Sequence, residues 1–292
     1  MFQRLLFCTD LSDGVYRLVN FVPSLAAAGV KQIVFLHSVP YLESGTVPRE
    51  DTEKINQARE RLGPALNNPS VGIEVKLEVV SGRPTDSILR AAKTHQVDLI
   101  VLGMPMHNQL KETLFGSTTV GLCQKAPIPL MIFRPQLISA YTSEELDLRC
   151  RHLFRCLLIP YDGTDTAKFL VEQIKGVAAN RPENSLERCY LCWVVEDVNR
   201  QGLPKDYQVE PARKVLESLK AELEGLNLNV DVEVRQGDVI SEILDAALID
   251  DVSAIAISSG SLGKFQELSI PSFARELLHR SWHPIIYFPQ DN

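Results

Sequence analysis

Two alternating hydrophobic periods run along the first half of the chain and predict strands separated by helices. Apolar runs typical of strands stand at residues 3–10, 31–39, 73–82, 97–103 and 129–133. Between them, apolar residues recur three or four positions apart, as on one helical face. These faces are Val15, Leu18, Val19 and Val22; Ile55, Ala58, Leu62 and Ala65; and, after Pro84, Ile88, Leu89 and Ala92. Such alternation favours an α/β fold with a parallel, doubly wound sheet.

The second half of the chain repeats the first. The segment FQRLLFCTDLSD at 2–13 aligns without a gap with FRCLLIPYDGTD at 154–165. This alignment places Asp10 on Asp162. Towards the other end, Val97 falls on Val252 and Pro129 on Pro284 at one shared offset. A repeat of one domain length indicates two tandem copies of the same fold.

The repeat predicts two domains, residues 1–138 and residues 152–292. The linker between them is expected near 136–151. Within it, Thr142 and Glu145 have the spacing of a capping box, which predicts the start of a short helix.

Composition and charge narrow the class of protein. Of the 292 residues, 45% are hydrophobic and 23% charged, which is ordinary for a globular protein. No apolar run approaches the length of a membrane span, and the N-terminal run is too short for a signal peptide, so we expect a cytoplasmic protein with no membrane partner. Residues 1–140 carry 14 Lys/Arg against 12 Asp/Glu, and residues 141–292 carry 16 against 25. Without a basic stripe, we expect no nucleic-acid partner.

The six cysteines are predicted to be reduced thiols in the core. They lack the dense spacing of a secreted disulfide scaffold. Cys189 and Cys192 form a C-x-x-C, but they lie in the strand-like run RCYLCWVV instead of at a helix start. Residues three apart on a strand point to opposite faces, so we expect no bridge between them.

The stretch from Val97 to Phe133 predicts an anion site. It reads as strand, loop, helix and strand, with Gly103 at the end of the first strand and Gly116-Ser117 at the helix start. A parallel strand delivers its loop to the carboxyl edge of the sheet, where Gly103 would let the backbone turn or approach a ligand. The first N–H groups of the helix are positioned to bind phosphate.

These residues resemble the universal stress protein family, whose nucleotide-binding members carry G-x2-G-x9-G-[S/T] here. Gly103 and Gly116-Ser117 match the first and last elements at the family spacing, while Met106 replaces the middle glycine. The resemblance covers both halves of the chain. It implies two tandem doubly wound domains, each with a five-stranded parallel sheet in the order 3-2-1-4-5. It also implies an intrachain pseudo-dimer through the last strands, and further assembly as a homodimer.

The resemblance implies that the first domain binds ATP or another adenine nucleotide, with or without magnesium. The residues carried into this site are Thr9, Asp10, Ser38, Gly82, Gly103, Met104, Met106, Gly116, Ser117 and Thr118. Lys111, Lys125 and Arg134 are further candidates as phosphate partners, and each is as easily a solvated charge. In the second copy Ser258 stands for Gly103 and Pro271 for Gly116, so the second phosphate loop is predicted to be degenerate.

Structural alternatives stand beside these assignments. Asp10 could instead cap the following helix, and Asp162 recurs in the copy that lost its glycines. Gly103 and Gly116 could be ordinary turn and helix-start glycines. A valine at position 116 is expected to strain the turn and to fill the phosphate position.

The leading function from the sequence is a non-enzymatic stress-response protein that binds an adenine nucleotide. The chain contains no G-x-x-x-x-G-K-[ST], no G-x-S-x-G and no zinc-type ligand set, so we assign no catalytic and no metal-binding residue. One alternative is a nucleotide-free dimerisation or interaction scaffold, in which Met106 has closed the site. A weaker alternative is a slow ATPase.

Overall fold

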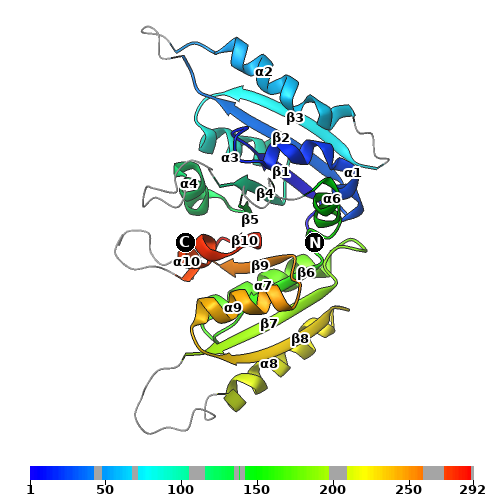
Figure 1. The fold of residues 1–292 in the computed structure, drawn as a ribbon, viewed down its shortest axis with the longest axis vertical. Helices are drawn as coiled ribbons and strands as arrows, with labels where there is room; N and C mark the ends of the chain where they lie inside the picture. Colours follow the sequence, from blue (N-terminus) through cyan, green and yellow to red (C-terminus); the bar gives the residue numbers. More distant parts are fainter. Residues whose placement is uncertain are drawn as a thin grey trace. The chain divides into compact units, whose positions relative to one another are not determined.

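The chain folds into two compact α/β units. We describe them from a computed structural model over residues 1–42, 48–67, 72–104, 116–134, 138, 142–196, 209–258 and 273–290. One unit comprises residues 2–151, and the other comprises residues 152–292 together with Met1. In each unit, helices cover both faces of a parallel sheet (Figure 1). The tandem α/β fold predicted from the sequence is confirmed.

The sheet of the first unit has the order β3-β2-β1-β4-β5, and its pairings are parallel. Leu5 lies near its centre, paired with Ile33 on one side and Leu99 on the other, and all three side chains are buried. Because the strands are parallel, the loops after all of them open at the same edge. The bounds are β1 Arg4–Cys8, β2 Gln32–Val39, β3 Glu74–Ser81, β4 Leu99–Gly103 and β5 Leu130–Phe133.

The helices of the first unit cover its sheet as the apolar periodicity predicts. α3 packs with α4 on one face, and α2 packs with η1 on the other. The predicted inward residues Ile55, Ala58 and Leu62 are buried. The bounds are η1 Val15–Asn20, α1 Val22–Ala27, α2 Thr52–Leu62, η2 Gly63–Asn67, α3 Pro84–Thr94, α4 Ser117–Lys125 and α6 Ser143–Arg151.

The first helix differs from the prediction. The apolar pattern favours one continuous helix from Val15, whereas the structure has the 3-10 helix η1, a break at Phe21, and then α1. Pro23 explains the break, because proline has no N–H to donate to the carbonyl four residues earlier. The apolar spacing alone does not reveal this interruption.

The linker helix α6 starts at the predicted capping box. The Thr142 N–H donates to Glu145 Oε2 at 3.1 Å, and the Glu145 N–H donates to Thr142 Oγ1 at 3.3 Å. α6 packs against α1, where the Ser24 hydroxyl hydrogen-bonds to the Asp147 carboxylate. The linker therefore adds a helix to the first unit.

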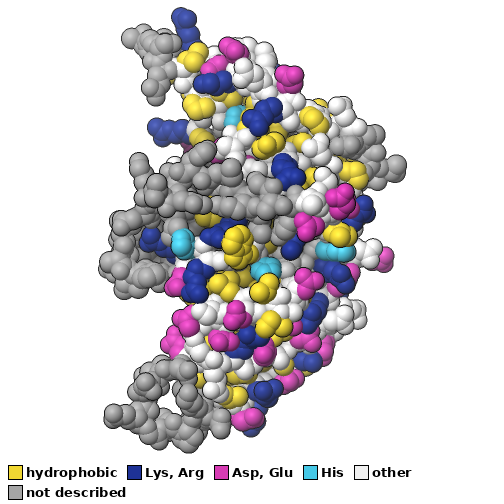
Figure 2. All heavy atoms as spheres, in the orientation of Figure 1, with side chains coloured by type: hydrophobic (Ala, Val, Ile, Leu, Met, Phe, Trp, Pro, Cys, Tyr) yellow, Lys and Arg dark blue, Asp and Glu magenta, His cyan; other side chains and the backbone are white. Residues whose placement is uncertain are grey.

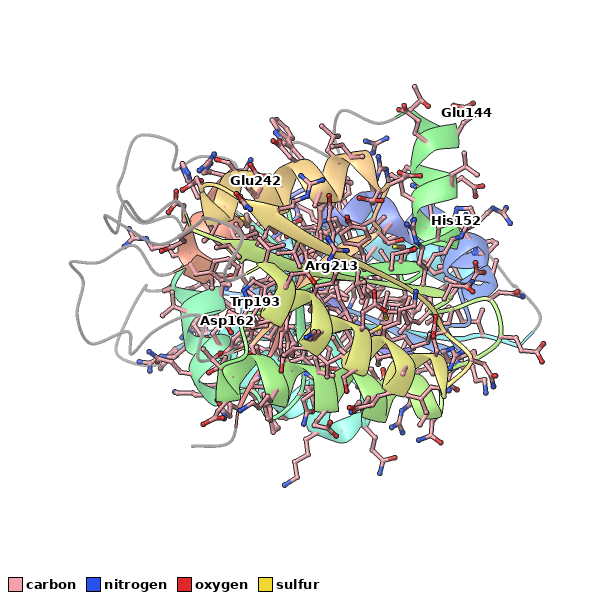
Figure 3. All side chains as sticks on the ribbon, turned by 90° about the horizontal axis from the view of Figure 1, so that it is seen from below. Glu144, His152, Asp162, Trp193, Arg213 and Glu242 are labelled. Carbon is pink, nitrogen blue, oxygen red and sulfur yellow. The ribbon has the colours of Figure 1, made fainter. Side chains whose placement is uncertain are left out.

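The second unit has the parallel strand order β8-β7-β6-β9-β10. α7 and α8 cover one face of this sheet, and α9 covers the other together with α10 (Figure 3). The bounds are β6 Cys156–Pro160, α7 Asp165–Ala179, β7 Arg188–Val195, α8 Val209–Glu224, β8 Asn229–Gln236, α9 Val239–Ile249, β9 Ala254–Ser258, α10 Phe273–Arg280 and β10 Ile285–Phe288. None of the helices among the described residues is long and apolar enough to cross a membrane.

One arginine joins two loops at the base of the second unit. The Arg181 guanidinium donates to four backbone carbonyls: Leu186 O at 2.8 Å, Ala178 O and Leu226 O at 2.9 Å, and Asn227 O at 2.8 Å. These carbonyls belong to the end of α7, the segment before β7 and the turn after α8. The rigid fork of the guanidinium matches such a spread of acceptors.

None of the six cysteines, all of which lie in the described part of the chain, forms a disulfide. Cys189 and Cys192 are buried on β7, and burial raises the pKa of each thiol to about 12.

We expect iodoacetamide at mildly alkaline pH to leave Cys189 and Cys192 unmodified in the native protein and to modify all six cysteines after unfolding without reductant. Mass spectrometry of the two samples checks this. Only four modified cysteines after unfolding would indicate a disulfide.

Candidate functional site

The candidate site lies at the carboxyl edge of the first sheet, where β1 runs into a tight turn. Thr9 follows β1, and its side chain is buried. Its hydroxyl donates to Asp13 Oδ1 at 2.7 Å and accepts from the Leu11 N–H at 2.9 Å. Leu11 adopts a positive φ of 66°. The turn therefore holds its shape through Thr9 and Asp13.

Asp10 caps this turn. Its Oδ1 accepts from the Ser12 N–H and hydroxyl, both at 2.8 Å, and from the Asp13 N–H at 2.9 Å. Asp162 does the same in the second unit, where its Oδ1 accepts from the Thr164 N–H at 3.0 Å and hydroxyl at 2.6 Å. A capping role shared by both copies explains why this aspartate recurs.

Asp13 is a buried carboxylate that the sequence analysis did not assign to the site. Its side chain accepts from Thr9 Oγ1, from the Val15 N–H at 3.0 Å and, more weakly, from the Asp10 N–H at 3.4 Å. Burial raises the pKa of Asp13 from 3.8 to about 6, although its hydrogen bonds oppose the rise. The aligned Asp165 has a side chain that is 97% exposed.

Gly103 makes room for Asp13. A Cβ at position 103 would lie 2.6 Å from Asp13 Cβ and Cγ and 2.7 Å from its Oδ2. Gly103 ends β4, pairs with Phe133 of β5, and is not among the glycines with positive φ. Its expected use in a backbone turn is therefore wrong, and the group that approaches it closely is a carboxylate of the same chain.

Gly116, Ser117 and Thr118 form the start of α4. Gly116 is the N-cap residue, and no side chain caps this end. Its φ of −60° and ψ of 147° are open to any residue, so the turn strain expected from a valine is wrong. The second expectation, that a valine side chain at position 116 would fill the phosphate position, does not depend on this backbone conformation and stays a prediction. The helix dipole and the first N–H groups make this end suited to an anion.

Ser38 and Gly82 lie at the same edge of the sheet. Ser38 is near the end of β2, and its Oγ is shielded from solvent without a hydrogen-bond partner in the described part of the chain. Gly82 follows β3 with a φ of 139°, which favours glycine, and its N–H donates to Val39 O at 3.0 Å. Gly237 repeats this conformation after β8 with a φ of 145°. The backbone thus requires Gly82 whether or not a ligand is present.

The remaining candidates divide between the two ends of the sheet. The Met104 N–H donates to Phe133 O at 3.0 Å, directly after β4. Met106 and Lys111 lie outside the described residues. Lys125 ends α4, about 12 Å along the helix axis from Ser117, so it does not join the helix start. Arg134 follows β5 at the carboxyl edge, where partial burial lowers its pKa.

Aromatic side chains occupy the corresponding edge of the second unit. Tyr161 and Trp193 stand where the first unit has Thr9 and His37, and their ring centroids are 5.6 Å apart. Trp193 also packs against Gly163, where a Cβ would lie 3.0 Å from the indole ring. Figure 3 shows Trp193 beside Asp162 at the end of the sheet. The indole therefore covers the turn that follows β6.

Charged side chains of both signs share the surface. On the face drawn in Figure 2, Lys and Arg side chains are interspersed with Asp and Glu over the helices of the second unit. Within the described ranges, no group of three or more His, Cys, Asp and Glu side chains is arranged to hold a metal ion.

Comparison with known proteins identifies the class of this fold. The model of the universal stress protein family matches residues 1–134 and again residues 154–289. The chain therefore belongs to the universal stress protein family, with two family domains in tandem. The family resemblance inferred from Gly103 and Gly116-Ser117 is confirmed.

Individual relatives cover either one unit or both. Universal stress protein MJ0577 of Methanocaldococcus jannaschii is 23% identical over 155 residues, which are 46% of this chain and 96% of that protein. Universal stress protein Slr1230 of Synechocystis is 26% identical over 132 residues, 45% of this chain and 42% of that protein. The crystal structure of a universal stress protein from Archaeoglobus fulgidus shares the fold over 99% of this chain and 98% of its own, with a TM-score of 0.64 and 19% identity.

Proposed function

We propose that the first unit binds an adenine nucleotide, ATP or a close relative, with or without magnesium, and that the chain acts as a non-enzymatic stress-response protein of the cytoplasm. The observation that carries the proposal is the uncapped N-terminus of α4 behind Gly116. In a parallel α/β sheet, ligands bind beyond the carboxyl ends of the strands, and a helix start receives their phosphates.

The groups around this helix start support an adenine nucleotide over a bare anion. Thr9 and Gly82 follow β1 and β3, and Ser38 lies near the end of β2, so all three are at the edge of the sheet where the α4 start also lies. The Ser38 hydroxyl lacks a partner in the described residues, and a ligand hydroxyl or ring nitrogen would satisfy it. The family resemblance implies the same ligand class.

We propose one nucleotide per chain, bound by the first unit. In the second unit, Trp193 covers the turn after β6, and Ser258 replaces Gly103. Residues 152–292, which form the second unit with Met1, also carry 22 Asp/Glu against 14 Lys/Arg, which disfavours an anionic ligand. Calorimetry with ATP should give a stoichiometry near one, and two equal sites would contradict the assignment.

The direct test is whether nucleotide accompanies the purified protein. The protein is denatured, and the supernatant is separated by ion-exchange chromatography with ATP, ADP and AMP as standards. We expect an adenine nucleotide in the supernatant or, after its removal, calorimetric binding of added ATP. If neither is found, the proposed function fails.

Substitutions in the loop locate the site. We expect Gly116→Val to weaken ATP binding at least about tenfold, because its side chain fills space at the α4 start. Met106→Gly should strengthen binding by restoring the family glycine. Ser258→Gly, at the corresponding edge of the second unit, is the control and should leave one site of unchanged affinity. Binding that is indifferent to Gly116→Val would mean that the site lies elsewhere.

A nucleotide-free scaffold is the second candidate function, and the position of Asp13 favours it. Its carboxylate lies against Gly103, at the surface where the family motif predicts close approach of a ligand. A negative charge there repels phosphate. Measuring ATP binding at pH 5 and at pH 8 separates the two functions, because a scaffold binds at neither pH.

A further inference from the structure

The contact between Asp13 and Gly103 connects two loops that are far apart in sequence. Asp13 lies in the turn after β1, and Gly103 is the last residue of β4, next to the loop that leads to α4. The distances of 2.6–2.7 Å from a Cβ at position 103 to the Asp13 side chain leave no space for alanine without movement. The added Cβ would meet Asp13 Cβ and Cγ, which are not a flexible chain end.

Asp13 is held on its other side by hydrogen bonds. Oδ1 accepts from the Thr9 hydroxyl at 2.7 Å and from the Val15 N–H at 3.0 Å, and only 3% of Asp13 is exposed. Displacing this side chain from Gly103 would therefore break hydrogen bonds that close the turn. Movement at one loop is thereby transmitted to the other.

We propose that Asp13 is a positioning residue, which acts through Gly103 to hold the turn after β1 and the end of β4 in the arrangement that binds nucleotide. The affinity part of this proposal rests on the proposed function, whereas the packing part does not. The Asp13 side chain sets the separation of the two loops.

The second unit shows the alternative arrangement. Asp165, aligned with Asp13, points to solvent and pairs with Lys168 at 2.9 Å. Ser258, aligned with Gly103, is buried, and its hydroxyl donates to Thr166 O at 3.1 Å. In the second unit, the strand β9 thus ends in a residue with a side chain, Ser258, and the aspartate faces solvent. In the first unit, β4 ends in Gly103, and the aspartate is buried.

The test introduces Gly103→Ala into three backgrounds: the parent, Asp13→Ala and Asp13→Gly. Alanine at position 13 keeps the Cβ that lies 2.6 Å from the new methyl group, whereas glycine removes it. We expect Gly103→Ala to weaken ATP binding at least about tenfold in the parent and in Asp13→Ala, and to have little effect in Asp13→Gly. An equal loss in all three backgrounds, or no loss in the parent, would overturn the proposal.

Hydrogen exchange of the peptides that contain β1 and β4 supplies a readout that needs no nucleotide. Gly103→Ala should lower their protection in the parent and Asp13→Ala backgrounds and leave it unchanged in Asp13→Gly. If Gly103→Ala alone does not fold, recovery of a folded protein in the Asp13→Gly double variant supports the contact, and its failure to fold overturns it. If the parent binds no ATP while the exchange pattern holds, the proposed function fails and only the packing part stands.

Discussion

Replacing Arg181 by alanine is expected to lower the free energy of unfolding of the second unit by about 3–5 kcal/mol. The guanidinium donates to four carbonyls, one at the end of α7 and three in two separate loops, and alanine leaves all four without this donor. Hydrogen bonds from charged groups are stronger than neutral ones. Replacing Arg181, which joins two loops, should therefore lower the free energy of unfolding more than replacing a surface arginine.

Urea unfolding monitored by tryptophan fluorescence measures this loss, because Trp193 and Trp282, the two tryptophans of the chain, lie in the second unit. Arg181→Lys should lose part of the stability, since an ammonium group has three donors and no planar fork. Arg213→Ala, at an exposed position of α8, is the control and should change stability by less than about 0.5 kcal/mol. A similar small effect for Arg181→Ala would show that the four hydrogen bonds contribute little.

The second large effect is a change in pH dependence caused by Asp13→Asn. Burial raises the pKa of Asp13 from 3.8 to about 6, so the native state holds this proton more tightly than the unfolded chain does. The contribution of Asp13 to stability is therefore fully present below about pH 4 and is lost as the pH rises through 6. Between these two pH limits, the contribution of Asp13 to the free energy of unfolding changes by about 3 kcal/mol. Asparagine does not titrate and removes this loss.

Asparagine also suits the local hydrogen bonds. Its carbonyl oxygen can accept from the Thr9 hydroxyl and the Val15 N–H, the two bonds that Oδ1 of Asp13 accepts. We expect Asp13→Asn to be more stable than the parent at pH 8 and similar to it at pH 4. Hydrogen exchange of first-unit peptides across this range measures the difference, and Asp165→Asn at an exposed site is the control. Parallel pH profiles for the parent and Asp13→Asn would contradict the burial argument.

Hydrophobic periodicity was sufficient to predict the α/β fold, because burial on both faces of a sheet dictates apolar strands and one-sided helices. The capping box at Thr142 was readable because both of its partners are local in sequence. The break at Phe21 was missed, although Pro23 was a usable signal for it. Helix boundaries could therefore be predicted from neighbouring residues where capping residues were considered, and the one break was missed where a proline was not.

The site was less accessible to prediction. Gly103 was identified from its spacing, but its contact with Asp13 joins positions 90 residues apart in the chain, and no local pattern reveals which way Asp13 points. The repeat was even misleading on this point, because Asp13 and the exposed Asp165 align without a gap. The conformation of Gly116 likewise follows from how α4 meets the sheet and not from its being glycine.

The Asp13–Gly103 contact also restricts the order in which the two positions can change during evolution. Any side chain at position 103 meets Asp13, so a substitution there is tolerated only after position 13 has changed or its side chain has turned outward. In the second unit, Asp165 faces solvent, and the fourth strand ends in Ser258. The two halves of the chain are thus open to different mutational paths from the same aligned aspartate. A serine is acceptable at the end of β9, whereas at the end of β4 it would first require a change at position 13.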